Sequence, residues 1–181
     1  LYSWGAQLEQ QSYPTSYIPT SGATATRNQE LCNNATPVIN SEEGTLYAEI
    51  SALADEATTK SISINSGSST NVVRISFFSN VILARIVSPS GTTSNLTYTV
   101  PSINDFYKVA FKYNATLNNH ALYVNGALRF TSTQVIDLGS SLTTLSFADG
   151  NAAGNFYGNT KDLKYYPKAL ADVQLQDLTT L

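Results

Sequence analysis

One histidine, one cysteine and a few acidic side chains are the residues of this 181-residue chain that could act as nucleophile, general base or metal ligand. His120 is the single histidine, and no Gly-x-Ser-x-Gly turn accompanies it, so an ordinary histidine at a turn edge is favoured over a catalytic base. Cys32 is the single cysteine, which excludes an internal disulfide and a cysteine-based zinc cluster. We therefore expect no catalytic residues.

The acidic residues are not spaced as hydrolysis of a glycosidic bond would require. That reaction uses two carboxyl groups, about 5–5.5 Å apart when it retains configuration and wider apart when it inverts. The acidic pairs at 42–43 and 55–56 lie outside the expected strands, and Glu49 stands alone on its face. The sequence thus predicts a protein that is not an enzyme.

The segment from 148 to 155 concentrates oxygen ligands in a short stretch. Asp149, Asn151 and Asn155 supply carboxylate and amide oxygens, which suit Ca²⁺. Against a metal, one carboxylate gives little charge, and Asx-Gly segments form turns by bonding their own backbone. The sequence leaves a calcium site and a plain turn as alternatives and favours the turn. We expect either no cofactor or Ca²⁺ held by these three side chains.

Aromatic side chains lie close to this segment in the sequence. Glycan recognition uses aromatic rings that stack on sugars and short amide or carboxyl groups that bond hydroxyls. We expect hairpin ends and the Asn-rich segment to converge, which makes a candidate ligand site of Tyr123, Asp149, Asn151, Asn155, Tyr157 and Tyr166. For any single one of these tyrosines, a place in the core or a hydrogen-bonded place at the rim is the favoured alternative.

The elements that must position these residues follow from composition and hydropathy pattern. Charged residues make up 13 % and apolar residues 42 %, while Ser, Thr and Asn supply 58 of the 181 residues. Low charge with many small polar residues is typical of β-sheet with frequent turns. From residue 44, apolar residues recur at every second position, as in Leu46, Ala48 and Ile50. This period of two predicts antiparallel strands with one buried face.

Turn signals separate the alternating segments, and Asn125-Gly126 predicts a hairpin. We therefore expect an all-β fold, an antiparallel two-sheet β-sandwich, with one short C-terminal helix at about residues 171–178. Leu170, Val173 and Leu178 would share the buried face of this helix. Prolines interrupt residues 1–43, so we expect an N-terminal strap there and a globular domain over 44–181.

In the C-terminal third, LYVNGAL at 122–128 and the segment at 156–178 resemble the laminin-G-like, concanavalin-A-like jelly-roll superfamily. LYVNGAL at 122–128 is similar to the LYVDG hairpin of that superfamily, and residues 156–178 follow its pattern of a glycine-containing strand and a short helix, at Gly158, Asp162, Lys164, Tyr165, Ala169 and Leu170. Asn125 replaces the usual Asp, Lys164 the common Arg, and Ala171 the usual Ser or Thr N-cap. The resemblance implies a concanavalin-A-like jelly roll and leaves function open, because the superfamily includes lectins, hydrolases and structural domains.

The strap carries a narrower resemblance. GAQLEQQ at 5–11, PTSYIPTSG at 14–22 and ATR at 25–27 are similar to a junction of phage tail-fibre and virion-surface proteins, with Trp4 and Arg27 in the expected places. There, this junction leads into a laminin-G-like jelly roll. The resemblance implies a bacteriophage structural protein on the virion surface, outside the cell, with other virion proteins and copies of itself as partners.

Charge and hydropathy exclude two further classes of partner. The net charge is −3 without a cluster of Lys or Arg, which argues against nucleic-acid binding. No apolar run reaches the roughly 18 residues of a membrane span, so we expect no membrane insertion.

The leading hypothesis is therefore a non-catalytic adhesion module that binds a host-surface polysaccharide or other glycan. The alternative is a purely structural capsid-decoration or fibre-spacer domain. A polysaccharide depolymerase is third, and the missing carboxylate pair weighs against it.

Overall fold

The structure is a computed structural model that describes residues 17–19, 21–23, 25, 37–55, 57–139 and 141–181. The chain divides into two compact units, Leu1–Glu30 and Leu31–Leu181, and all described strands and the helix belong to the second. Trp4, Arg27 and Cys32 lie outside the described residues, so their expected roles stay predictions.

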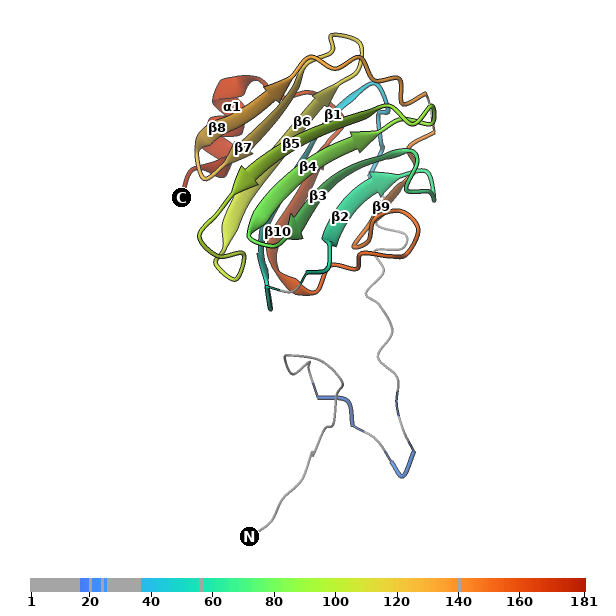
Figure 1. The fold of residues 1–181 in the computed structure, drawn as a ribbon, viewed down its shortest axis with the longest axis vertical. Coiled ribbons are helices and arrows are strands. Elements are labelled where there is room, and N and C mark those ends of the chain that lie inside the picture. Colours follow the sequence, from blue (N-terminus) through green and yellow to red (C-terminus); the bar gives the residue numbers. More distant parts are fainter. Residues whose placement is uncertain (1–16, 20, 24, 26–36, 56, 140) are drawn as a thin grey trace. The chain divides into compact units, whose positions relative to one another are not determined.

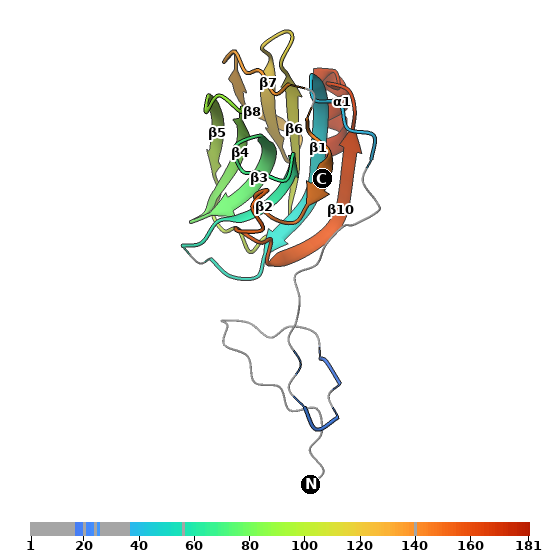
Figure 2. The same cartoon turned by 90° about the vertical axis from the view of Figure 1, so that its right-hand side faces the viewer.

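In the described part of the chain, ten strands form two antiparallel five-stranded sheets that face each other (Figures 1 and 2). The first, called sheet 1, has the order β10-β1-β6-β7-β8, with strands Gly158–Tyr166, Glu43–Ala52, Tyr107–Asn114, His120–Val124 and Ala127–Ser132. The second, sheet 2, has the order β5-β4-β3-β2-β9, with strands Thr93–Thr99, Val81–Val87, Val72–Phe78, Lys60–Asn65 and Thr144–Ser146. The predicted all-β sandwich of jelly-roll type is confirmed.

The core lies between the sheets and consists of the alternating apolar residues. Leu46 and Ile50 of β1 face Ile62, Ile75 and other apolar side chains of sheet 2, all fully buried. The intervening residues point to the outer faces, as the period of two requires. Only every second residue of a strand therefore has its side chain on an outer face, where it can contact a ligand.

The hairpin predicted at Asn125-Gly126 is confirmed. The two residues join β7 to β8 with φ of 49° and 75°, the left-handed conformation that a two-residue type I′ turn requires. Asn125 also accepts a hydrogen bond from the Lys108 N–H through Oδ1 (2.9 Å), which fixes the turn to β6.

Helix α1, Asp172–Thr179, lies on the outer face of sheet 1 (Figure 2). Its N-cap, Ala171, offers no side-chain acceptor, and the Gln174 side chain accepts the Ala171 N–H instead (3.1 Å). The predicted buried face is partly wrong: Val173 is 69 % exposed, whereas Leu175 is fully buried between β1, β6 and β7. A helix of two turns buries only one or two residues against the sheet. The orientation in which the helix packs on the sheet decides which residues these are.

Residues just before β1 belong to the sandwich unit. The Asn40 N–H donates to the Tyr165 hydroxyl (3.0 Å), and the Ser41 hydroxyl accepts the Leu142 N–H (3.1 Å). Among the described residues, no helix could span a membrane.

Candidate functional site

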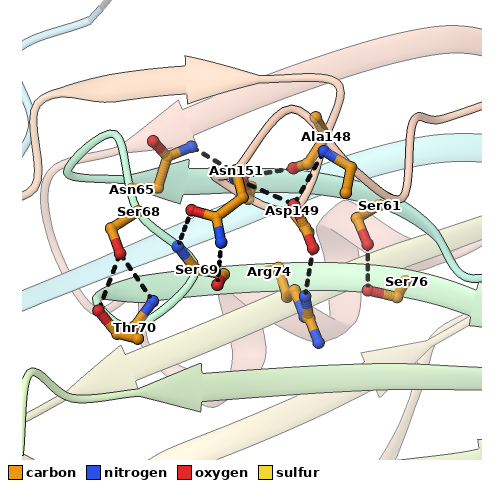
Figure 3. A network of polar contacts seen from close by, with 12 residues as sticks. Ser61, Asn65, Ser68, Ser69, Thr70, Arg74, Ser76, Ala148, Asp149 and Asn151 are labelled. Carbon is orange, nitrogen blue, oxygen red and sulfur yellow. Dashed lines mark hydrogen bonds and ion pairs between the residues drawn. The ribbon is translucent and has the colours of Figure 1, made fainter.

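The outer face of sheet 2 carries polar side chains where a solvent-facing sheet surface is expected, and several of them are buried. Ser61 and Ser63 of β2 and Ser76 of β3 are fully buried although they point away from the core. They are covered by the segment of residues 147–157, here called the Asp149 loop: the Ser63 hydroxyl donates to the Ala148 carbonyl (2.6 Å), and the Ser61 N–H donates to the Gly154 carbonyl (2.8 Å). This loop forms one wall of the candidate site (Figure 3).

Two arginines lie side by side next to this wall. Arg74 of β3 and Arg85 of β4 are direct cross-strand partners on the outer face of sheet 2. Both are half-buried, and the Arg74 side chain is only 12 % exposed. Among the described residues, nothing accepts a hydrogen bond from Nε of either arginine, although both nitrogens are buried. The pair therefore places two cations side by side, each with one buried N–H donor that has no partner among the described residues.

Burial and charge both act on Arg74. Desolvation lowers the pKa of the Arg74 guanidinium, the neighbouring Arg85 cation lowers this pKa further, and the Asp149 carboxylate opposes them. Arginine remains charged because its ordinary pKa is so high. The site thus holds two cations in a partly dry environment, where an anion would be attracted more strongly than in water.

Asp149 faces Arg74 from the loop. Its Oδ2 lies 3.8 Å from Nη1 of Arg74, while its Oδ1 accepts the N–H groups of Asn151 (3.0 Å) and Ala153 (3.2 Å). Gly150 follows with φ of +103°, and a Cβ there would lie 2.5 Å from the Ser68 carbonyl oxygen, so only glycine fits.

Asn151 fastens the loop to the turn between β2 and β3. Its Nδ2 donates to the Ser69 hydroxyl (2.7 Å), and its Oδ1 accepts the Ser69 N–H (3.0 Å), as Figure 3 shows. Both polar ends of this side chain are occupied, so Asn151 positions the loop.

Asn155 and Tyr157 lie where the loop leaves sheet 2. Asn155 forms a bridge with Ser61, and its Nδ2 donates to the Tyr157 hydroxyl (3.5 Å). Its buried Oδ1 has no partner among the described residues. The Tyr157 side chain is 46 % exposed, which leaves part of the ring open for a ligand.

The other two predicted tyrosines lie on the outer face of sheet 1, not beside the loop. Tyr123 is only 4 % exposed because α1 covers it, and burial, then the charge and hydrogen bond of Asp172, raise the pKa of its phenol. Tyr166, on β10 opposite Thr45, is half-buried on the same face. The expected convergence of all six candidates is therefore wrong for Tyr123 and Tyr166.

The three proposed calcium ligands do not fit a calcium ion in this arrangement. Asp149 offers Oδ1 to two N–H groups and Oδ2 to Arg74, and Asn151 offers Oδ1 to a backbone N–H. A nearby guanidinium also repels a cation. Within the described part of the chain, no group of three His, Cys, Asp or Glu side chains gathers.

Glu49 has an acidic neighbour that the sequence did not indicate. The strand register places it opposite Asp162 of β10 on the outer face of sheet 1. Each carboxylate has its own lysine partner, Lys161 for Glu49 (3.4 Å) and Lys164 for Asp162. Both carboxylates are therefore engaged in ion pairs on the outer face of sheet 1.

Sequence reasoning missed Arg74 and Arg85, and one signal could have found them. Ser79 and Asn80, with φ of 46° and 59°, form a two-residue turn between β3 and β4. Such a turn fixes the hairpin register, and counting back from it brings position 74 opposite position 85.

Comparisons with known proteins place the fold. No protein-family model matches the chain, and no curated protein matches it in sequence. The structure is similar to the CBM40 domain, a carbohydrate-binding module, of Ruminococcus gnavus IT-sialidase bound to α2,3-sialyllactose (TM-score 0.65, 17 % identity, 77 % of this chain and 83 % of that chain).

Two larger proteins contain a similar domain. Leech intramolecular trans-sialidase, solved with 2,7-anhydro-Neu5Ac, gives a TM-score of 0.61 at 21 % identity over 77 % of this chain and 23 % of that chain. The botulinum neurotoxin serotype G binding domain gives 0.59 at 12 % identity over 78 % of this chain and 37 % of that chain. At these identities the similarity shows a shared fold.

Proposed function

We propose that this domain is a non-catalytic carbohydrate-binding module that takes an acidic saccharide on the outer face of sheet 2. The observation that carries the proposal is the Arg74–Arg85 pair, two half-buried arginines directly opposite each other, of which only Arg74 has a carboxylate partner among the described residues. The saccharide's carboxylate would lie against both groups.

Arginine pairs suit this ligand for a geometric reason. A guanidinium presents planar N–H donors whose spacing matches the two oxygens of a carboxylate. Like charges directly opposite each other destabilise a sheet, so the unliganded pair is unfavourable and an anion relieves the repulsion. Asn155 and the exposed part of Tyr157 would extend the site toward neutral sugar units.

The structural neighbours support an acidic glycan. The CBM40 domain was solved with α2,3- and α2,6-sialyllactose, and a botulinum neurotoxin DC binding domain with SialylT. Sialic acid carries a carboxylate at neutral pH, which is the group that the Arg74–Arg85 pair is suited to bind.

Calorimetric titration of the full chain with 3′-sialyllactose and with lactose tests the proposal. Replacing Arg74→Gln or Arg85→Gln should weaken sialyllactose binding about tenfold or more, because each change removes charge-assisted hydrogen bonds. Lys168→Gln, an exposed change outside sheet 2, serves as the charge-matched control and should bind normally. Equal binding of lactose, or unchanged binding in both arginine variants, would contradict the proposal.

The biological setting that we propose is a bacteriophage virion surface, and it rests on the resemblance of the strap at 5–27. Many copies on one particle would convert a weak site into firm attachment, since linked sites raise the effective concentration of the ligand. A structural role is the second candidate, because Leu128 and Phe130 on edge strand β8 are 50 % and 48 % exposed. A stable oligomer without any saccharide binding would favour that role.

A further inference from the structure

We propose that Asp149 sets the charge of the arginine site, so that it accepts a saccharide with one negative charge and discriminates against doubly charged anions. The inference rests on the proposed function and adds a specificity-determining residue to it. Without Asp149 the site would hold two cations; with it, one positive charge is left to be matched by the ligand.

The two carboxylate oxygens of Asp149 have separate tasks. Oδ1 is used inside the loop, where it accepts the N–H groups of Asn151 and Ala153. Oδ2 is turned toward Arg74 at 3.8 Å, a distance at which charge acts but no hydrogen bond forms (Figure 3). Asp149 therefore reduces the charge of the site without forming a hydrogen bond to Arg74.

The compensation is unequal between the two arginines. Arg74, the one beside the loop, has a carboxylate partner, whereas Arg85 has no ion-pair partner among the described residues. Other acidic side chains with described positions, such as Glu49 and Asp162, lie on sheet 1 and have lysine partners of their own. The remaining positive charge is thus concentrated at Arg85.

The loop holds the Asp149 carboxylate in place. Asn151 clamps the Ser69 backbone and hydroxyl, and Gly150 packs so closely on Ser68 that no larger residue fits. The Asp149 N–H also donates to the Ala153 carbonyl (2.9 Å). A carboxylate fixed in this way remains beside Arg74 when a ligand arrives and repels a second negative charge on it.

The variant Asp149→Asn tests this inference, because asparagine keeps Oδ1 for the loop and removes only the charge facing Arg74. The full chain is titrated with 3′-sialyllactose, which carries one charge, and with 6-sulfated 3′-sialyllactose, which carries two. We expect affinity for sialyllactose to rise about threefold, and affinity for the sulfated saccharide to rise more. Asp177→Asn on α1, an equal charge change on the far sheet, should alter neither affinity.

The outcomes separate this inference from the proposed function. If the unaltered chain binds sialyllactose and Asp149→Asn binds it more weakly, Asp149 is a direct acceptor for sugar hydroxyls, and the charge-setting role is overturned. An equal gain for both saccharides also overturns it. If the unaltered chain binds neither saccharide, the proposed function fails.

The salt dependence of the unfolding free energy, measured without ligand, tests the charge-setting role independently of saccharide binding. Asp149→Asn leaves the repulsion between Arg74 and Arg85 uncompensated, so its unfolding free energy should rise with added salt more steeply than that of the unaltered chain. The additional change Arg85→Gln should abolish the difference. Identical salt dependence in the unaltered chain and in Asp149→Asn would overturn the inference.

Discussion

At the scale of single residues, the outer faces of the two sheets differ in how their cationic side chains are paired with carboxylates. On sheet 1, Lys112, Lys161 and Lys164 each have a carboxylate partner. On sheet 2, Arg74 and Arg85 oppose each other, and among the described residues only Arg74 has a carboxylate partner, Asp149 at 3.8 Å. Opposed like charges in a sheet destabilise it by a few tenths of a kcal/mol to about 1 kcal/mol. A bound anionic ligand would offset this repulsion between the two arginines.

His120 is a buried histidine whose surroundings favour its neutral form. It is fully buried; its Nδ1 accepts the Asn114 N–H (3.4 Å) and its Nε2 contacts the Gln134 carbonyl (3.0 Å). An Nδ1 acceptor and an Nε2 donor describe a neutral ring. Burial lowers the pKa of His120, and the Gln134 carbonyl opposes the shift only partly.

This arrangement predicts a loss of stability below the ordinary histidine pKa. Because the folded-state pKa lies below the unfolded one, stability is complete above pH about 6.5 and decreases as pH falls toward the folded value, at most by about 1.4 kcal/mol per pH unit. Urea unfolding at several pH values measures the effect. His120→Gln should lose this dependence; if it kept the same slope between pH about 6.5 and 5, another group would be responsible.

The residue scale also shows where sequence reasoning stops. Asp149, Asn151 and Asn155 were singled out because they concentrate carboxylate and amide oxygens in a short segment, and the structure places all three in the Asp149 loop. Their role in binding a ligand stays a prediction. Arg74 and Arg85 were missed because each looks like an ordinary exposed position of an alternating strand. Their pairing depends on the hairpin register, which the Ser79-Asn80 turn sets.

At the scale of elements, an apolar contact and an ion pair are among the contacts that attach α1 to sheet 1. Leu175 is buried against Tyr47, Ala110 and neighbouring residues, and Lys112 Nζ donates to Asp172 Oδ1 at 2.6 Å. The Lys112 side chain is 8 % exposed and that of Asp172 is 68 % exposed. The hydrogen bond to Lys112 lowers the pKa of Asp172, and the carboxylate also suits the positive N-terminus of the helix.

Asp172→Asn should therefore destabilise the domain by about 1 kcal/mol, because it leaves the Lys112 ammonium under the helix without its carboxylate. Asp177→Asn, with the same charge change in the last helical turn, serves as the control and should not destabilise it. Chemical denaturation measures both variants. Equal stability of Asp172→Asn and the unaltered chain would show that the Lys112–Asp172 ion pair does not help to hold the helix.

The elements themselves were largely predictable. Alternation identified β1 to β4 and β6, the Asn125-Gly126 signal identified the β7–β8 hairpin, and β5 and β9 were not predicted. The helix expected at about 171–178 lies at Asp172–Thr179. The buried face of this helix was not predictable. In so short a helix, the hydropathy pattern is as consistent with a buried Val173 as with a buried Leu175. Tyr123 illustrates the same limit: its parity beside Leu122 and Val124 places it outside the core, but only the docked helix explains its burial.

At the scale of the whole sandwich, the two outer faces are unequal. Helix α1 occupies part of the outer face of sheet 1, while on sheet 2 the Asp149 loop covers β2 and leaves the arginines beside it. This division places the candidate site on the sheet opposite to the helix. It also explains why predicted candidates from both sheets could not converge on one ligand.

A crystal structure of the full chain soaked with 3′-sialyllactose tests the central claim most directly. The account predicts the sialic acid carboxylate within hydrogen-bond distance of the Arg74 and Arg85 guanidinium groups, with the remaining sugars toward Asn155 and Tyr157. Saccharide bound instead on sheet 1, near Tyr166 or the Glu49–Asp162 pair, would contradict it.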